Sequence, residues 1–376
     1  MGRRGKAAVA AVTALWVGLA SAGGAPSGAA ADDASVDLQV VANLQVAPGN
    51  ITLSPDGRIF ISQHQFFNPQ YRVVEVMGDG TTRPFPNPQW ASAPGADGVG
   101  MQAVLGLRAT PDGIVWMLDN GSTPPKLVGW DLGNDTLHRV IPIPEPASIK
   151  GSFLNDFAVD PVNGAIYIAD FADAPEKAAL VVVELASGEA RRVLQGDRST
   201  RPEGVPIVVE NRHVRLRKGD GTDAEPRIGV NPITIDVEYQ WVYFGAMNGN
   251  TLWRARTTDL INDGLSPAEL SARVERFGHK PVSDGISIDS GGGVYITDLG
   301  EGGIGVTIEG GSYRVLVADQ QKLSWPDAIS GGPDGRMYVA VNQLHKSPPL
   351  NGGVNGATPP FYIVSFQPLS PAAVGR

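Results

Sequence analysis

The chain of 376 residues contains no cysteine. This absence excludes disulfide bonds, thiol catalysis and thiolate metal sites. Charged residues are also scarce, at 18%, whereas glycine (47) and proline (30) are frequent. That composition is typical of many short strands joined by turns. The body of the chain has no apolar run long enough to span a membrane, so a globular all-β protein is the expected class.

The N-terminus has the layout of a secretory signal. Arg3, Arg4 and Lys6 precede an apolar run at 7–20 and then small residues, which is the order of a basic region, a hydrophobic region and a cleavage region. We therefore expect a signal peptide over 1–31, export to the periplasm or the exterior, and one mature domain over 32–376. Export by the general secretory route and export by the twin-arginine route both stay open.

Removal of those three basic residues lowers the formal net charge from −9 to −12. An acidic body disfavours nucleic acid and anionic membranes as partners. The sequence thus favours a small-molecule ligand, and we expect a monomer.

One sequence unit recurs along the chain. In the stretch 282–298 a short apolar segment, a glycine turn and a second segment with a central aromatic residue follow one another. The same order occurs at 50–62, 105–119, 155–170, 231–245 and 326–341. The six aromatic residues are Phe60, Trp116, Tyr167, Tyr243, Tyr295 and Tyr338. Repeats of roughly 40–50 residues that are built from strands predict a β-propeller, here with six blades.

Each repeated pair is followed by two further strand patterns, with glycine turns at 78–80, 133–135 and 187–188. This predicts four-stranded antiparallel blades. The last blade has only three candidate strands. We expect the N-terminal strand near 38–41 to supply the fourth and close the ring, which would remove an exposed edge.

Three segments interrupt the repeat. An insertion at 198–229 carries a basic run at 212–218, which we interpret as a solvated hairpin or lid rather than a nucleic-acid patch. Ser266, Pro267 and Glu269 form a capping box that predicts a short helix. The glycines of 300–305 are expected in a connection between strands, and without a following helix they do not predict a phosphate site.

The candidate ligand-binding residues lie where a propeller gathers its strand starts and returning loops. Loops on a rigid scaffold commonly carry function. The strand starts contribute Asn50, Asn155, Asp156, Asn231, Asp284, Trp325 and Asp327, and the loops contribute His64, Phe171 and His345.

Several readings of these residues stay open. Carboxylate and amide oxygens suit Ca²⁺ or another divalent cation, and crowded carboxylates can also act as general bases. Asp and Asn at such positions, including Asp119, Asp170 and Asp298, equally often cap turns. The two histidines could be acid–base groups or merely exposed, and the aromatic residues could stack a ligand or plug the channel.

The chain resembles the major royal jelly protein/Yellow family, in particular its bacterial members. The resemblance spans about residues 36–368 and is carried by Leu154-Asn-Asp-Phe-Ala-Val-Asp160 with Tyr167-Ile-Ala-Asp170, Val242-Tyr-Phe-Gly-Ala246, Arg276-Phe-Gly278, Ser283-Asp-Gly285, Trp325-Pro-Asp327 and Asn342-Gln-Leu-His345. It implies a six-bladed propeller, secretion and a small-molecule pocket. Because insect members include dopachrome-converting enzymes, binders of biogenic amines and nutritive proteins, it suggests an aromatic or aminergic ligand and isomerase-type activity. It assigns no catalytic residue, and the lack of cysteine departs from the insect proteins.

A more distant resemblance is to the regucalcin/gluconolactonase group, which implies a metal-dependent lactone hydrolase. In that group a Glu, an Asn and an Asp hold the metal. Asn155 and Asp284 match the last two, whereas Asn50 stands in place of the Glu. A non-enzymatic interaction propeller is the third alternative, so whether the protein is an enzyme stays open.

Overall fold

The computed structural model describes residues 36–376. The expected signal peptide at 1–31 lies outside the described residues. Within the described part, no helix is long and apolar enough to cross a membrane.

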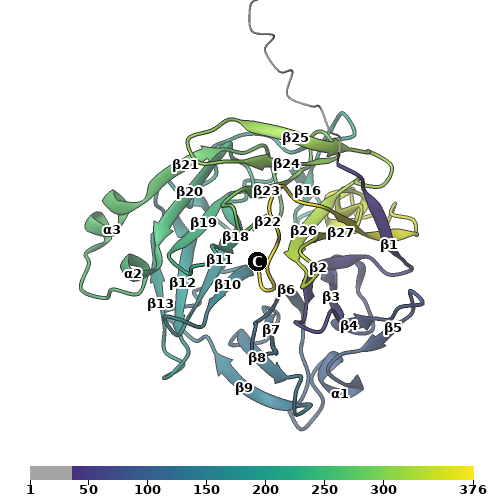
Figure 1. Ribbon diagram of the computed structural model, residues 1–376, viewed down its shortest axis with the longest axis horizontal. Coiled ribbons are helices and arrows are strands. Elements are labelled where there is room, and N and C mark those ends of the chain that lie inside the picture. Colours follow the sequence, from purple (N-terminus) through teal and green to yellow (C-terminus); the bar gives the residue numbers. More distant parts are fainter. Residues whose placement is uncertain (1–35) are drawn as a thin grey trace, which may run out of the picture. The chain divides into compact units, whose positions relative to one another are not determined.

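Six four-stranded antiparallel sheets stand around a central channel (Figure 1), so the predicted six-bladed β-propeller is confirmed. The first blade consists of β2 (Pro48–Leu53), β3 (Ile59–Gln63), β4 (Val73–Val76) and β5 (Thr82–Pro84). The second consists of β6 (Val104–Ala109), β7 (Ile114–Asp119), β8 (Lys126–Asp131) and β9 (Thr136–Pro142). The third consists of β10 (Leu154–Asp160), β11 (Ala165–Asp170), β12 (Ala179–Glu184) and β13 (Ala190–Val193).

The other three blades follow the same plan. The fourth consists of β18 (Val230–Ile235), β19 (Trp241–Ala246), β20 (Thr251–Arg256) and β21 (Glu275–His279). The fifth consists of β22 (Ile286–Ile288), β23 (Val294–Asp298), β24 (Gly303–Thr307) and β25 (Tyr313–Ala318). The sixth consists of β26 (Pro326–Gly331), β27 (Met337–Val341), β28 (Phe361–Phe366) and β1 (Gln39–Leu44).

The sixth blade closes the ring with strands from both ends of the chain. β1 pairs antiparallel with β28, and Gln39 faces Ser365 while Leu44 faces Phe361. The prediction that an N-terminal strand completes the last blade is therefore confirmed. The closure leaves no inter-blade gap through which the core would be wetted.

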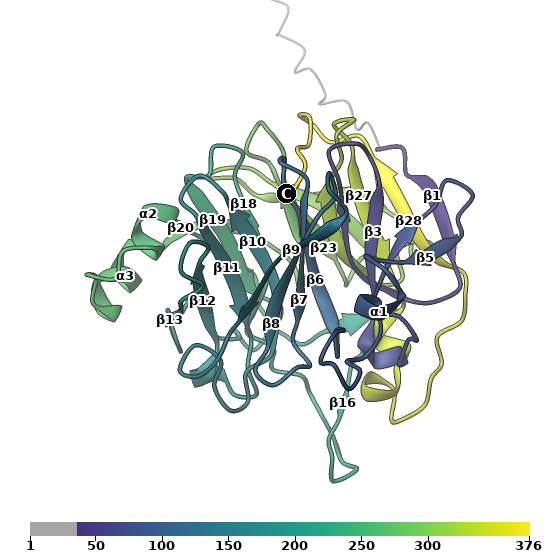
Figure 2. The same ribbon diagram turned by 90° about the horizontal axis from the view of Figure 1, so that it is seen from below.

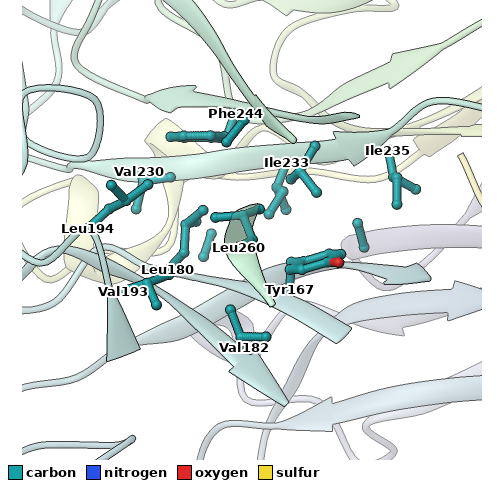
Figure 3. Packing of buried hydrophobic residues seen from close by; sticks show 14 of the residues in the cluster. Tyr167, Leu180, Val182, Val193, Leu194, Val230, Ile233, Ile235, Phe244 and Leu260 are labelled. Atoms are coloured by element: carbon teal, nitrogen blue, oxygen red, sulfur yellow. The ribbon is translucent and has the colours of Figure 1, made fainter. Parts of the chain in front are cut away.

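The hydrophobic core lies between neighbouring blades. Figure 3 shows one such interface, where Tyr167 and Leu180 of the third blade pack with Ile233 and Phe244 of the fourth. Five of the six repeated aromatic residues are buried, and Tyr338 is half-buried. Each aromatic residue thus fills the space between two sheets, where truncation to alanine typically costs about 3–5 kcal/mol.

Two details differ from the sequence prediction. Gly303 and Gly305 lie inside β24 rather than in a connection. A Cβ on Gly305 would collide with the ring of Tyr313, so close packing, and not a turn, requires this glycine. The segment Glu275–His279 forms β21, a strand that the sequence pattern does not distinguish.

The α-helices within residues 36–376 are short, namely α1 (Pro88–Ala91), α2 (Thr257–Leu260) and α3 (Pro267–Arg273). Ser266 Oγ accepts from the backbone N–H of Glu269, and the Glu269 side chain accepts from the backbone N–H of Ser266, so the predicted capping box is present.

The insertion at 198–229, called here the lid segment, forms two small hairpins. These are β14 (Val208–Val209) with β15 (Arg212–His213), and β16 (Leu216–Arg217) with β17 (Asp223–Ala224). Its base is closed by a hydrogen bond from Val230 N–H to Thr200 O, at 2.8 Å. In Figure 2 β16 lies at the lower rim of the ring, at the end where the innermost strands begin.

The C-terminal residues lie at the other end of the channel. Ser290 N–H donates to Pro371 O, Ala372 N–H to Gly335 O and Gly331 N–H to Arg376 O, each at 2.9 Å. These partners belong to the turns after the innermost strands of the fifth and sixth blades. Figure 1 places the chain end at the centre of the ring, so this segment covers the end opposite the lid segment.

We predict that a chain starting at Ala47, which lacks β1, melts at least roughly 10 °C lower and self-associates, because it loses the partner of β28 and exposes a strand edge. Differential scanning calorimetry and size-exclusion chromatography measure both effects. A chain starting at Val36 is the control. Equal melting temperatures and a monomeric shortened chain would contradict the role of β1.

Candidate functional site

A cavity of about 230 Å³ opens at the end of the ring where the innermost strands begin. Nine of the ten residues proposed from the sequence line it: Asn50, His64, Asn155, Asp156, Phe171, Asn231, Asp284, Trp325 and Asp327. The tenth, His345, is not among the lining residues. Its ring stacks on that of Trp325, with centroids 5.9 Å apart and planes 14° apart, so it supports the wall from behind.

The walls of the cavity are mostly apolar, and much of this surface was not predicted. The lid segment contributes Ile207, Val214, Leu216, Pro226 and Ile228. The blades and loops add Gly49, Phe66, Leu105, Phe153, Met247, Leu344 and Leu350. A signal for the lid residues exists in the run His-Val-Arg-Leu-Arg at 213–217, because apolar residues that alternate with basic ones indicate a strand with one buried face.

Aromatic rings form one side of the wall. Phe153 and Phe171 are stacked, with centroids 4.5 Å apart and planes 20° apart. His64 and Phe66 meet edge to face at 4.8 Å. Phe171 therefore belongs to a cavity wall and does not plug the channel.

Three carboxyl groups, those of buried Asp156 and Asp284 and of half-buried Asp327, called here the carboxyl trio, line the cavity together with several amide side chains. Asp156 Oδ1 accepts from Asn50 Nδ2 at 2.7 Å, and Asn50 Oδ1 accepts from Arg108 Nη1 at 3.1 Å. Asp327 Oδ2 accepts from Asn342 Nδ2. Each carboxyl group thus has an amide partner.

Asp284 belongs to a hydrogen-bonded row of side chains from four blades. Its Oδ2 accepts from Trp325 Nε1 at 2.7 Å, and its Oδ1 accepts from Asn231 Nδ2 at 2.6 Å. Asn231 Oδ1 in turn accepts from Asn155 Nδ2. The row forms because the innermost strands bring these residues to one level of the channel.

Burial raises the pKa of the whole trio. The pKa of Asp156 is raised to about 6, with the charge of Arg108 opposing the rise. Burial raises the pKa of Asp284 to about 7, against the hydrogen bond from Trp325 and with repulsion from Asp156. Burial and repulsion from Asp284 and Asp156 raise the pKa of Asp327 well above its usual range. Asp156 and Asp284 therefore exchange protons near neutral pH.

Two buried cations lie close to the trio, and the sequence reasoning missed both. Arg108 donates from Nη1 to Asn50 Oδ1, and its Nε has no partner among the described residues. Lys280 Nζ donates to Gly249 O and Pro281 O, both at 2.9 Å, and burial lowers its pKa to about 7. A lone arginine inside the apolar strand β6 was the available signal for Arg108.

Neither histidine is exposed: His64 is buried, and the side chain of His345 is 11% exposed. Burial lowers the pKa of His64 to about 3, and its Nδ1 accepts from Phe66 N–H at 3.2 Å. Burial lowers the pKa of His345 to about 4 even though Glu210 Oε1 lies 3.5 Å from its Nε2. Both imidazoles are neutral at physiological pH, so neither supplies a charge to the cavity.

The carboxylates that follow the second strands serve the backbone. Asp119 accepts from Ala103 N–H at 3.1 Å, Asp170 from Phe153 N–H at 2.7 Å and Asp298 from Gly300 N–H at 3.1 Å. They are turn caps, the structural alternative for these positions.

The donor set does not fit a bound divalent cation. No group of three His, Cys, Asp or Glu side chains within residues 36–376 is arranged to hold a metal. Both oxygens of Asp284 already accept hydrogen bonds, as does Asn50 Oδ1, which also lies beside the Arg108 guanidinium. Among the matched positions, only Asn155 Oδ1 is left without a donor, whereas Ca²⁺ requires six or more oxygen ligands.

Comparison with known families shows to which family the chain belongs. Residues 112–349 match the family model described as "Major royal jelly protein". The chain belongs to the major royal jelly protein family. No curated protein sequence matches this chain.

Solved structures share its fold at low sequence identity. A luciferin-regenerating enzyme is 12% identical with a TM-score of 0.55, over 90% of this chain and 98% of its own. A putative gluconolactonase is 13% identical with a TM-score of 0.54, over 90% and 94% of the two chains. Regucalcin from Agrobacterium tumefaciens C58, a calcium-binding protein, is 14% identical with a TM-score of 0.52, over 91% and 98%. At such identity the likeness establishes the propeller fold alone.

The raised pKa values give a stability prediction. A carboxyl group whose pKa is higher in the folded than in the unfolded chain binds its proton preferentially in the folded state, so stability falls as pH rises from about 4 through the folded pKa. Replacing Asp327 by Asn removes one such group while keeping an oxygen that can accept from Asn342.

We therefore expect Asp327→Asn to match the parent at pH 4 and to become progressively more stable than the parent towards pH 8, by more than about 1 kcal/mol. Urea unfolding at a series of pH values measures this difference. The opposite pH effects of His64 and His345 are common to both proteins and cancel. A constant difference across the pH range would contradict the raised pKa of Asp327.

Proposed function

We propose that this member of the major royal jelly protein family binds a small organic cation, an amine with a flat apolar or aromatic body, in the cavity at the channel mouth. One observation carries the proposal: three carboxyl groups, two of them buried and the third half-buried, line a cavity whose walls are mostly apolar. Burying charge without a partner is costly, so this arrangement favours a ligand that brings a positive charge.

The shape and chemistry of the wall support the same ligand class. Stacked Phe153 and Phe171 offer flat faces to an aromatic ring or a cation. The lid segment covers the ligand body with aliphatic side chains such as Ile207 and Val214. An ammonium group beside Asp284 or Asp327 would form charge-assisted hydrogen bonds in a site of low dielectric, where such bonds are strong.

The trio also has the proton chemistry that isomerase-type activity requires. Groups with a pKa near the working pH are effective general acids and bases, and the pKa values of Asp156 and Asp284 are raised to about 6 and 7. Turnover of an aminochrome by the parent and not by Asp327→Asn would support this extension of the proposal. Turnover unaffected by the substitution would remove it.

We also propose that the protein is exported, on the basis of the basic and apolar N-terminal pattern at 1–31. The mass of the mature protein recovered from its native host tests this. An intact N-terminus inside the cell would contradict it.

The amine proposal predicts that Asp284→Asn weakens binding of tyramine by about ten- to hundredfold, the effect of losing a charge-assisted hydrogen bond. Isothermal titration calorimetry measures the affinity. The affinity of the parent should fall as pH drops from 8 to 5, because the trio must then lose protons to pair with the ammonium group. Asp79→Asn, at an exposed turn, is the control. Equal tyramine affinity in Asp284→Asn and the parent would refute the proposal.

The metal-dependent lactone hydrolase is the second candidate, supported by the fold it shares with a putative gluconolactonase and by the unpartnered Asn155 Oδ1. The donor set argues against it.

We predict that the protein purified without chelator contains less than one divalent ion per chain, and that EDTA shifts its melting temperature by less than about 1 °C. A bound ion that stabilises only the folded state would raise the melting temperature, and its removal would lower it. One tightly held ion per chain with a loss of stability in EDTA would establish the metal site instead.

A further inference from the structure

The row of hydrogen bonds at the channel mouth ends at an unsatisfied atom. Asn155, Asn231 and Asp284 occupy equivalent positions in three successive blades, each two residues before the residue at which the regular strand pairing starts, namely Phe157, Ile233 and Ile286. All three line the cavity. Asn155 Oδ1 is buried and has no hydrogen-bond partner among the described residues.

The direction of the row is fixed at its Asp284 end. One terminal atom of the Asn231 amide lies 2.6 Å from Asp284 Oδ1 and 3.3 Å from the backbone carbonyl oxygen of Asp284. A backbone carbonyl only accepts hydrogen bonds, so that atom must be Nδ2, whether or not the carboxyl group carries a proton. Trp325 Nε1, which only donates, holds the other carboxylate oxygen at 2.7 Å.

The orientation is passed from Asn231 to Asn155. With Nδ2 directed to Asp284, Asn231 presents Oδ1 to Asn155, and an amide oxygen can only accept. Asn155 must therefore donate from Nδ2, which leaves its Oδ1 as the free end of the row.

The next blade provides no donor for that oxygen. The residue of the second blade equivalent to Asn155 is Leu105, two residues before Leu107, where the regular pairing of that blade starts. Its side chain is apolar and also lines the cavity. A buried carbonyl without a donor is destabilising, so the row is complete only when a molecule in the cavity donates to it.

We propose that Asn155 Oδ1 is a hydrogen-bond acceptor for the ligand, and that Asn231 and Asp284 are positioning residues that hold it in this orientation. The inference rests on the proposed function and makes it more specific. The cavity should select cations whose charged group carries hydrogen-bond donors, such as primary and secondary ammonium groups, over quaternary ammonium groups of the same charge and body.

The test compares tyramine with N,N,N-trimethyltyramine, which keeps the ring and the positive charge and lacks N–H donors. By calorimetry we expect the parent to bind tyramine at least about tenfold more tightly than the quaternary probe. In Asn155→Leu this ratio should fall at least about threefold. In Asn231→Leu it should fall similarly although Asn155 is intact, because Asn155 is then free to reverse its amide. Thermal unfolding verifies that each variant is folded.

Asn163→Ala is the matched control. It removes an amide that donates from Nδ2 to Asp160 Oδ2 at 2.8 Å, the same type of pair, in a turn that does not line the cavity. It should keep the ratio of the parent. A ratio unchanged in both Asn155→Leu and Asn231→Leu would overturn the inference and indicate that ordered water completes Asn155.

A second measurement separates this inference from the proposed function. A crystal structure at a resolution that shows amide hydrogens, or a neutron structure, reports the orientation of Asn155 without any ligand. Asn155 Nδ2 directed at Asn231 is expected. The reversed amide would overturn the inference even if amines bind, whereas binding of neither probe together with the expected orientation would refute the amine proposal and leave a neutral donor as the ligand class.

Discussion

Each blade of this propeller can bury its apolar faces only against the blades beside it, and the remaining structure depends on this constraint. The clusters of buried side chains join neighbouring sheets, as those of the third and fourth blades do. A linear row of such sheets would leave one apolar face of each terminal sheet exposed to water. The pairing of β1 with β28 removes both ends at once, which explains how a chain without disulfide bonds can maintain a stable fold.

The closed ring also explains how polar side chains are held in an apolar cavity. Six innermost strands start at one level, so Asn155, Asn231 and Asp284 come within hydrogen-bonding distance although they are far apart in sequence. Backbone carbonyls and the Trp325 indole then fix their orientations. The rigidity of the ring offsets the cost of desolvating the carboxyl trio. The raised pKa values of the three carboxyl groups are the result of that desolvation.

The sequence was informative wherever a feature repeats. Six aromatic residues at equivalent positions, followed by further strand patterns, were sufficient to predict the blades and the closure by an N-terminal strand. The same periodicity located the channel mouth, and nine of the ten candidate residues line one cavity.

Several features that occur once were missed or misplaced. His345 lies in a loop whose path depends on Trp325 and Glu210. Arg108 lies within the apolar strand β6 and Lys280 follows the polar strand β21, and only the completed ring shows what surrounds them. Gly305 of β24 reflects contact with Tyr313 of the neighbouring strand, which cannot be identified before the register is known.

The lid segment has a consequence for how this family can diversify. Its two ends meet at the hydrogen bond between Val230 and Thr200, so its length and composition can change without moving the blades on either side. Under the proposed function, the ring binds the charged end of the ligand and the lid segment contacts its body. Exchange of residues 198–229 between relatives would therefore be a route by which evolution alters the preferred ligand body while it inherits the same charged-group recognition.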